Sequence, residues 1–228
     1  MHRRHFGIGI ILLMAIAAAG VGLRRTGVLN APHRHGHPRS HTEKSAHAEY
    51  PSEAVVTHVA DGDTFTTKEG PKVRLLNIDT PETGEAFSIE ARKRLEQLVL
   101  GKKVRLMYDK EREDGYGRLL CHVYEGDTWV NVLLVREGLA AVYIVKPNVG
   151  RMKEVVEAQR AARKAKAGIW SLPPPAGEKY YVSSANSFCF HRPGCKLAKG
   201  ISPKNMIRIP TRDAALDKGL SGCRTCLP

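Results

Sequence analysis

The segment RLLNIDTPET, residues 74–83, joins an apolar strand pattern to charged groups at its end. Arg74 lies inside the run KVRLLNID, Asp79 closes that run, and Glu82 follows Pro81 in the next turn. A short run rich in apolar and β-branched side chains, bounded by turn residues, indicates a strand. The segment therefore predicts one guanidinium and two carboxylates close together at the end of a strand.

The sequence around this segment predicts a mixture of short strands and helices. Strands are expected at residues 53–60, 63–68, 72–79, 103–109 and 118–125. Helices are expected at residues 88–100, 130–137 and 151–168, where apolar side chains recur at helical spacing. Five strands and three helices indicate an α+β fold, a small five-stranded β-barrel with helices packed on it. Periodicity alone also permits another α+β arrangement.

Charge is distributed unevenly along the 228 residues. The formal net charge is +13, but residues 51–172 carry twenty Lys and Arg against eighteen Asp and Glu. The excess positive charge therefore lies on the two flanks. Basic flanks predict a polyanionic partner, a nucleic acid or an anionic membrane surface, held without sequence preference.

The N-terminus carries a run of eighteen uncharged residues, 6–23, with two arginines on each side. This length fits a short membrane anchor, a signal peptide cleaved after Ala19, or a buried helix of a soluble domain. The first two alternatives place the rest of the chain outside the cytoplasm, either anchored to the cell membrane facing outside or secreted or periplasmic. We expect a hydrophobic helix here.

The composition divides the chain into five parts. Five histidines between residues 33 and 47 could bind a metal, although the Pro- and Ser-rich composition favours a flexible linker. The expected parts are a signal peptide or membrane anchor at 1–25, a His/Pro-rich linker at 26–50, the barrel domain at 51–172, a Pro-rich linker at 173–179 and a small domain at 180–228.

The barrel domain contains the residue types needed to hydrolyse a phosphodiester. Asp63 and Asp79 stand at neighbouring strand ends and could give oxygen ligands to a hard cation. Glu82 could accept a proton from water, while Arg74 and Arg118 could grip a phosphate. Each residue alone is an ordinary turn or surface residue, but their joint occurrence indicates attack of water on a phosphodiester.

Five motifs also resemble the staphylococcal nuclease (thermonuclease) family over residues 55–170. They are DGDT (61–64), VRLLNIDTPET (73–83), DGYGRLLCHVY (114–124), VNVLLVREGLAAVY (130–143) and KPN (146–148). The resemblance implies an OB-fold barrel with five strands and three helices. It also implies a calcium-dependent phosphodiesterase that cleaves DNA and RNA to 3′-phosphorylated products.

The resemblance assigns expected roles to individual residues. The calcium ligands would be Asp63, Asp79 and the carbonyl of Thr80; the catalytic residues would be Arg74, Glu82 and Arg118; the substrate-binding residues would be Tyr116, Tyr143 and Lys146. Two features depart from the family. The segment after Glu82 is shorter than the flexible loop of the staphylococcal enzyme, and Val145 replaces a second tyrosine, which predicts weaker base stacking.

Four of the five cysteines lie near the C-terminus. His191, Cys195, Cys223 and Cys226 are separated by three, twenty-seven and two residues, a spacing that allows two close pairs to meet around zinc. A disulfide is the alternative, because exported proteins often contain them. Cys189 could replace His191 as a ligand, and Cys121 is expected to be a buried strand residue.

The segments FHRPGC (190–195) and GCRTCLP (222–228) are similar to the zinc-binding domain of the Ada DNA-repair protein. His191 stands where Ada has a cysteine that is both ligand and methyl acceptor, and an imidazole cannot perform that alkyl transfer. We therefore expect a structural zinc module that assists DNA binding and has no repair activity.

Three functions are compatible with these observations. The first is an exported, membrane-tethered, monomeric nuclease that acts on DNA and RNA with calcium as catalytic ion and zinc as structural ion. The second is a nucleic-acid-binding module that has lost turnover. The third is a cell-surface metal-binding protein that uses the histidine-rich linker and the cysteines.

Overall fold

The computed structural model describes residues 50–228. The hydrophobic helix expected in residues 1–25 lies outside this range, and so does the His/Pro-rich linker expected at 26–50, apart from Tyr50. Among the helices of residues 50–228, none has both the length and the apolar character to cross a bilayer.

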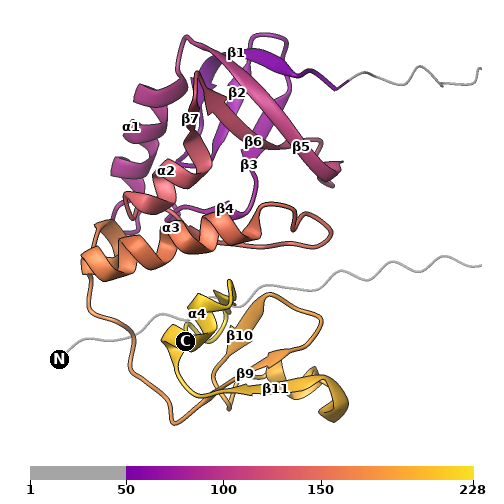
Figure 1. The fold of residues 1–228 in the computed structure, drawn as a ribbon, viewed down its shortest axis with the longest axis vertical. Coiled ribbons are helices and arrows are strands. Elements are labelled where there is room, and N and C mark those ends of the chain that lie inside the picture. Colours follow the sequence, from indigo (N-terminus) through magenta and orange to yellow (C-terminus); the bar gives the residue numbers. More distant parts are fainter. Residues whose placement is uncertain (1–49) are drawn as a thin grey trace, which may run out of the picture. The chain divides into compact units, whose positions relative to one another are not determined.

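Residues 53–129 build a barrel whose sheet closes on itself (Figure 1). Its strands are β1 (Glu53–Val59), β2 (Thr64–Thr67), β3 (Lys72–Leu75), β5 (Lys103–Glu113), β6 (Leu119–Glu125) and the short β7 (Thr128–Trp129). The sheet order is β3-β2-β1-β5-β6-β7, and a parallel pairing of β3 with β6 closes the ring. The predicted five-stranded barrel is thus confirmed.

Alternation along β3 separates the core from the charged site. Val73 and Leu75 are buried in the barrel core, at 0% and 1% exposure. Because side chains of a strand point alternately to its two faces, Arg74 between them points away from the core. The same strand therefore supplies two residues to the core and one charged residue to the outer face.

The strand predicted at residues 72–79 is interrupted in the structure. It divides into β3 and β4 (Ile78–Asp79), because Asn77 adopts a left-handed conformation with φ of 64°. The short β4 leaves the barrel sheet and pairs with β8 (Ala141–Val142). Asp79 therefore belongs to a small second sheet. Conversely, the strand predicted at 103–109 continues to residue 113 as β5.

Three helices accompany the barrel, as predicted. They are α1 (Ser88–Val99), α2 (Val130–Arg136) and α3 (Met152–Ala165), each ending one to three residues before its predicted end. Asn131 of α2 is fully buried: its Oδ1 accepts from the Val123 amide at 2.9 Å, and its Nδ2 donates to the carbonyls of Leu76 (3.0 Å) and Cys121 (3.2 Å). This side chain ties α2 to β6 and to the turn before β4.

The C-terminal residues form a separate four-stranded sheet. Its elements are β9 (Tyr181–Ser184), β10 (Cys189–His191), β11 (Met206–Ile209), β12 (Ser221–Gly222) and α4 (Arg212–Asp217), with the 3₁₀ turns η2 (Ala198–Gly200) and η3 (Pro203–Asn205). The order of its strands is β11-β9-β10-β12. The 3₁₀ turn η1 (Gly168–Ser171) follows α3. A small core of its own surrounds Phe190, with Tyr181 packed edge-on at 5.5 Å between ring centroids.

Helix α3 contacts strand β8 and helix α4 through polar side chains. The buried Gln159 accepts from the Val142 amide of β8 at 2.8 Å and donates to the Leu216 carbonyl of α4 at 3.4 Å. Arg163 forms ion pairs with Asp213 and, at 2.6 Å, with Asp217 of α4. These contacts connect helix α4 of the C-terminal residues to α3, the helix that also bonds to β8.

Candidate active site

A cavity of about 520 Å³ contains most of the predicted site residues. Its charged lining consists of six carboxylates and three guanidinium groups: Asp61, Asp63, Asp79, Glu82, Glu111 and Asp114, with Arg74, Arg118 and Arg224. These residues come from the turn before β2, from β3 and β4, from the β5–β6 hairpin and from the C-terminal turn. The cavity lining is therefore acidic overall, and its basic residues are all arginines.

Asp63 is fixed by the turn between β1 and β2. A Cβ on Gly62 would lie 2.8 Å from Thr80 and Ala91 side-chain atoms, so the turn packs as closely as only glycine allows. The Asp63 Oδ2 accepts from the amide and hydroxyl of Thr80 at 3.0 and 3.1 Å. Burial raises the pKa of Asp63 to about 6, although Arg74 opposes this shift.

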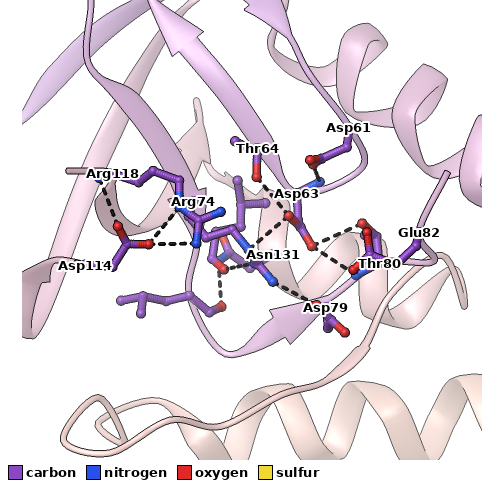
Figure 2. A network of polar contacts seen from close by, with 12 residues as sticks. Asp61, Asp63, Thr64, Arg74, Asp79, Thr80, Glu82, Asp114, Arg118 and Asn131 are labelled. Carbon is purple, nitrogen blue, oxygen red and sulfur yellow. Dashed lines mark hydrogen bonds and ion pairs between the residues drawn. The ribbon is translucent and has the colours of Figure 1, made fainter. Parts of the chain in front are cut away.

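Arg74 lies between the two predicted calcium ligands (Figure 2). Its Nε is 3.0 Å from Asp63 Oδ1, its Nη2 is 3.0 Å from Asp79 Oδ1, and its Nη1 donates to the Leu75 carbonyl at 2.6 Å. The side chain is only 13% exposed. Arg74 is therefore held rigidly, with its charge shared between two carboxylates.

Arg118 is oriented by Asp114 of the preceding turn (Figure 2). Its Nε and Nη2 are both 2.7 Å from Asp114 Oδ2, while Asp114 Oδ1 accepts from the amides of Tyr116 and Arg118. Partial burial of Asp114 opposes ionisation, but the hydrogen bonds from Arg118 outweigh it and lower the pKa of Asp114. The pair thus presents a charged guanidinium at the cavity.

Glu82 projects from the turn after β4 and is 70% exposed. Its amide donates to Glu85 Oε2 at 2.8 Å, which fixes the backbone of the turn. Its carboxylate is 3.5 Å from the Arg224 guanidinium. Glu82 therefore carries a solvent-accessible carboxylate beside the buried Asp63–Arg74–Asp79 network, as a proton acceptor for water requires.

The predicted substrate-binding residues divide into two groups. Tyr116 and Tyr143 line the cavity, and Tyr116 is 88% exposed with the Arg118 guanidinium 5.5 Å from its ring centroid. Lys146 does not line this cavity: its ammonium group lies 5.8 Å from the Phe188 ring, next to two other cavities. Val145 lines the main cavity and is half exposed.

The sequence matches the family described as Staphylococcal nuclease homologue over residues 72–172. A thermonuclease of Staphylococcus hyicus is 37% identical over 125 residues, 51% of this chain and 74% of that protein. A micrococcal nuclease of Shigella flexneri is 35% identical over 132 residues, 52% of this chain and 73% of that protein. The chain belongs to the staphylococcal nuclease family.

An uncharacterized protein of Bacillus anthracis is 38% identical over 135 residues, and the match spans 54% of this chain and 63% of that protein. The closed five-stranded barrel with its helices fits the OB-fold of this family. The relatives named as nucleases confirm the predicted enzyme class. The family match ends at residue 172, so the C-terminal residues lie beyond it.

The donor set of the nuclease cavity fits calcium. Calcium binds carboxylate, carbonyl and water oxygens. Asp63 and Asp79 approach the same guanidinium at 3.0 Å, and carboxylates outnumber guanidinium groups two to one around the cavity. Asp63 and Asp79 therefore supply oxygen atoms of the kind that a calcium ion binds.

Four C-terminal side chains converge on a second candidate metal site, the Cys/His cluster. The ligand atoms of His191, Cys195, Cys223 and Cys226 all lie within 4.8 Å of one another. Zinc–ligand bonds of about 2.0–2.3 Å put the ligands of a tetrahedral zinc roughly 3.5 Å apart. All five cysteines of the chain lie within the described range, and none of them forms a disulfide there.

The surroundings of the Cys/His cluster also fit zinc. The amides of Arg192 and Thr225 donate to the sulfurs of Cys226 (3.3 Å) and Cys223 (3.4 Å), and such bonds favour thiolates. The pKa of Cys223 is lowered accordingly, whereas burial raises the pKa of Cys226 to about 11. Burial lowers the pKa of His191 and so favours its neutral imidazole, the form that binds a metal. Its Nδ1 is buried without a hydrogen-bond partner in the described structure. Cys189 borders Cys223, so it stays an alternative ligand.

Sequence reasoning missed four charged residues of the nuclease cavity, Asp61, Glu111, Asp114 and Arg224. Asp61 and Asp114 lie in the motifs DGDT and DGYGR, so their turns gave a local signal. Arg224 lies 145 residues from its partner Asp79, in a segment that indicated only zinc binding. Such a contact depends on how α3 and α4 pack, and no local pattern reports it.

Proposed function

We propose that the protein is a calcium-dependent, sugar-nonspecific nuclease that hydrolyses DNA and RNA to 3′-phosphate products. The observation that supports this proposal is the convergence of Asp63, Arg74, Asp79, Glu82 and Arg118 on one cavity. Calcium would be held by Asp63, Asp79 and Thr80 and would supply positive charge that polarises the phosphate and the attacking water.

The residues of the chain would divide the reaction between them. Glu82 would take a proton as the water oxygen bonds to phosphorus, and the bond from phosphorus to the 5′ oxygen would break, leaving a 3′-phosphate. Arg74 and Arg118 would bind the phosphate and stabilise its transition-state charge. Solvent would protonate the leaving 5′ oxygen.

The remaining parts of the proposal concern location and the second metal. Residues 1–25 would export the chain and tether it to a membrane, which the uncharged run at residues 6–23 supports. Calcium at about millimolar levels outside cells would suffice for an exposed carboxylate site. The Cys/His cluster would hold structural zinc, and the protein would act as a monomer.

Nuclease assays on the full-length chain test this function. We expect release of 3′-phosphorylated fragments from single-stranded DNA and from RNA with calcium, and no release with a calcium chelator. Glu82→Gln and Arg118→Ala should each reduce kcat by at least about a hundredfold. The exposed Arg92→Ala, on α1 away from the cavity, is the matched control and should retain full activity.

The alternative, a nucleic-acid-binding module without turnover, gives a different result. That module would bind oligonucleotides but release no fragments at any calcium concentration. Binding without products by the unaltered chain would therefore refute the nuclease and support the alternative.

A further inference from the structure

Arg224 extends from the Cys/His cluster into the nuclease cavity. Its Nη2 is 2.5 Å from Asp79 Oδ2 and its Nη1 is 3.5 Å from Glu82 Oε1. Its guanidinium carbon lies 5.7 Å from the centre of the Tyr143 ring. One arginine of the C-terminal residues thus contacts three residues expected to bind calcium, activate water and bind a nucleotide.

The backbone that carries Arg224 is well fixed. Arg224 follows Cys223, whose amide donates to the Phe190 carbonyl at 2.9 Å and whose carbonyl accepts from the Leu227 amide at 2.9 Å. Two residues later Cys226 contributes a second sulfur to the Cys/His cluster. A metal bound by both cysteines would therefore hold the backbone of Arg224 from both sides.

The charge of the cavity gives Arg224 a role in binding an anion. Six carboxylates face three guanidinium groups there, so even a bound divalent cation leaves no excess of positive charge for a phosphate. Arg74 is 13% exposed and bound by two carboxylates, and Arg118 is 31% exposed and bound by Asp114. Arg224 is 61% exposed, the most accessible of the three.

Asp79 does not need Arg224 as its counter-ion. Its Oδ1 is already paired with Arg74, whereas Arg224 occupies Oδ2. An exposed ion pair of this kind contributes at most about 1 kcal/mol, so a phosphate can compete for the guanidinium. Arginine can form two parallel hydrogen bonds to a phosphate, the same number that it can form to a carboxylate. Exchange of Asp79 for a phosphate therefore loses no hydrogen bond of the Arg224 guanidinium.

We propose that Arg224 is a third arginine of the nuclease site, supplied by the C-terminal domain and positioned by the Cys/His cluster, and that it binds a phosphate of the polynucleotide. This proposal rests on the proposed nuclease function. It makes the C-terminal domain a part of the substrate site and not only a separate nucleic-acid-binding unit.

Steady-state kinetics of full-length Arg224→Ala on single-stranded DNA test the proposal. We expect KM to rise about fivefold while kcat changes less than twofold, because the proposed contact binds the substrate and its transition state equally. Arg224→Lys keeps the charge without the paired hydrogen bonds and should give an intermediate KM. Arg208→Ala is the matched control. Arg208 belongs to β11, its guanidinium lies over the Tyr180 ring, and it does not line the cavity.

A binding measurement separates this proposal from the nuclease function itself. Anisotropy of a fluorescent oligothymidylate with calcium, in chains that also carry Glu82→Gln, reports affinity without cleavage. Arg224→Ala should weaken binding about fivefold in that background. Absence of hydrolysis by the unaltered chain would refute the nuclease, whereas unchanged KM and unchanged anisotropy in Arg224→Ala would refute the role of Arg224.

Discussion

His122 is a buried residue whose protonation state affects stability. It is 2% exposed, both ring nitrogens lack a hydrogen-bond partner within residues 50–228, and it packs edge-on against Trp129 at 5.2 Å between centroids. Burial, assisted by the nearby Arg151, lowers the pKa of His122 to about 4. The folded protein therefore keeps this imidazole neutral at physiological pH.

The free energy of unfolding should fall as the pH is lowered, because protonation of His122 is less favourable in the folded state than in the unfolded state. The folded pKa lies below the unfolded value of about 6.5, so the contribution is complete above pH 6.5 and is lost as the pH falls through 4. The full loss is about 3 kcal/mol. Urea unfolding of the unaltered chain and of His122→Phe between pH 7 and pH 4 measures this loss. The difference in unfolding free energy between the two chains should change with pH. A difference that stays constant would contradict this prediction.

Val145 is the residue at which the base-stacking surface differs from the family pattern. It is 52% exposed and lines the nuclease cavity together with Tyr143. An aromatic ring at this position should stack on a base, a contact worth about 1–3 kcal/mol. We predict that Val145→Tyr lowers KM for single-stranded DNA at least about fivefold with kcat unchanged. Val145→Leu is the control for added volume, and an equal effect of both substitutions would exclude stacking.

At the scale of the elements, one amide side chain aligns the segment that carries Asp79. The hydrogen bonds of Asn131 run from α2 to the Val123 amide and to the Leu76 and Cys121 carbonyls. These backbone groups lie in β6 and in the turn between β3 and β4. Because the side chain is fully buried, its removal leaves them without partners.

Asn131→Ala should therefore destabilise the fold by about 2–4 kcal/mol. Chemical denaturation followed by tryptophan fluorescence measures this loss, since Trp129 lies two residues before Asn131. Asn131→Asp keeps the shape and the oxygen acceptor but loses the two donated hydrogen bonds, so it should also destabilise. An effect below about 0.5 kcal/mol for both would show that water replaces these bonds.

Local sequence patterns predicted the barrel strands and most charged residues of the site, because turn residues and strand ends are short-range features. They could not predict that the run 72–79 breaks at Asn77, since the break depends on pairing of β4 with β8, about sixty residues later. They also could not predict Lys146 beside Phe188 or Arg224 beside Asp79. These placements follow from packing between distant elements.

For the whole molecule, α3 is the structural link between the cavity and the Cys/His cluster. Gln159 bonds to both β8 and α4, and Arg163 pairs with Asp213 and Asp217 of α4. The segment after α4 leads through β12 to Cys223 and Arg224. A change in the contact between α3 and α4 should therefore act on the position of Arg224.

We predict that Arg163→Ala raises KM for single-stranded DNA about fivefold, as Arg224→Ala does, although Arg163 lies outside the nuclease cavity. If both substitutions act through the same guanidinium, the double variant should be no worse than Arg224→Ala alone, which steady-state kinetics of the four chains would show. Lys164→Ala, an exposed substitution on the same helix, is the control and should leave KM unchanged. Multiplicative effects in the double variant would mean that α3 and Arg224 act on the substrate independently.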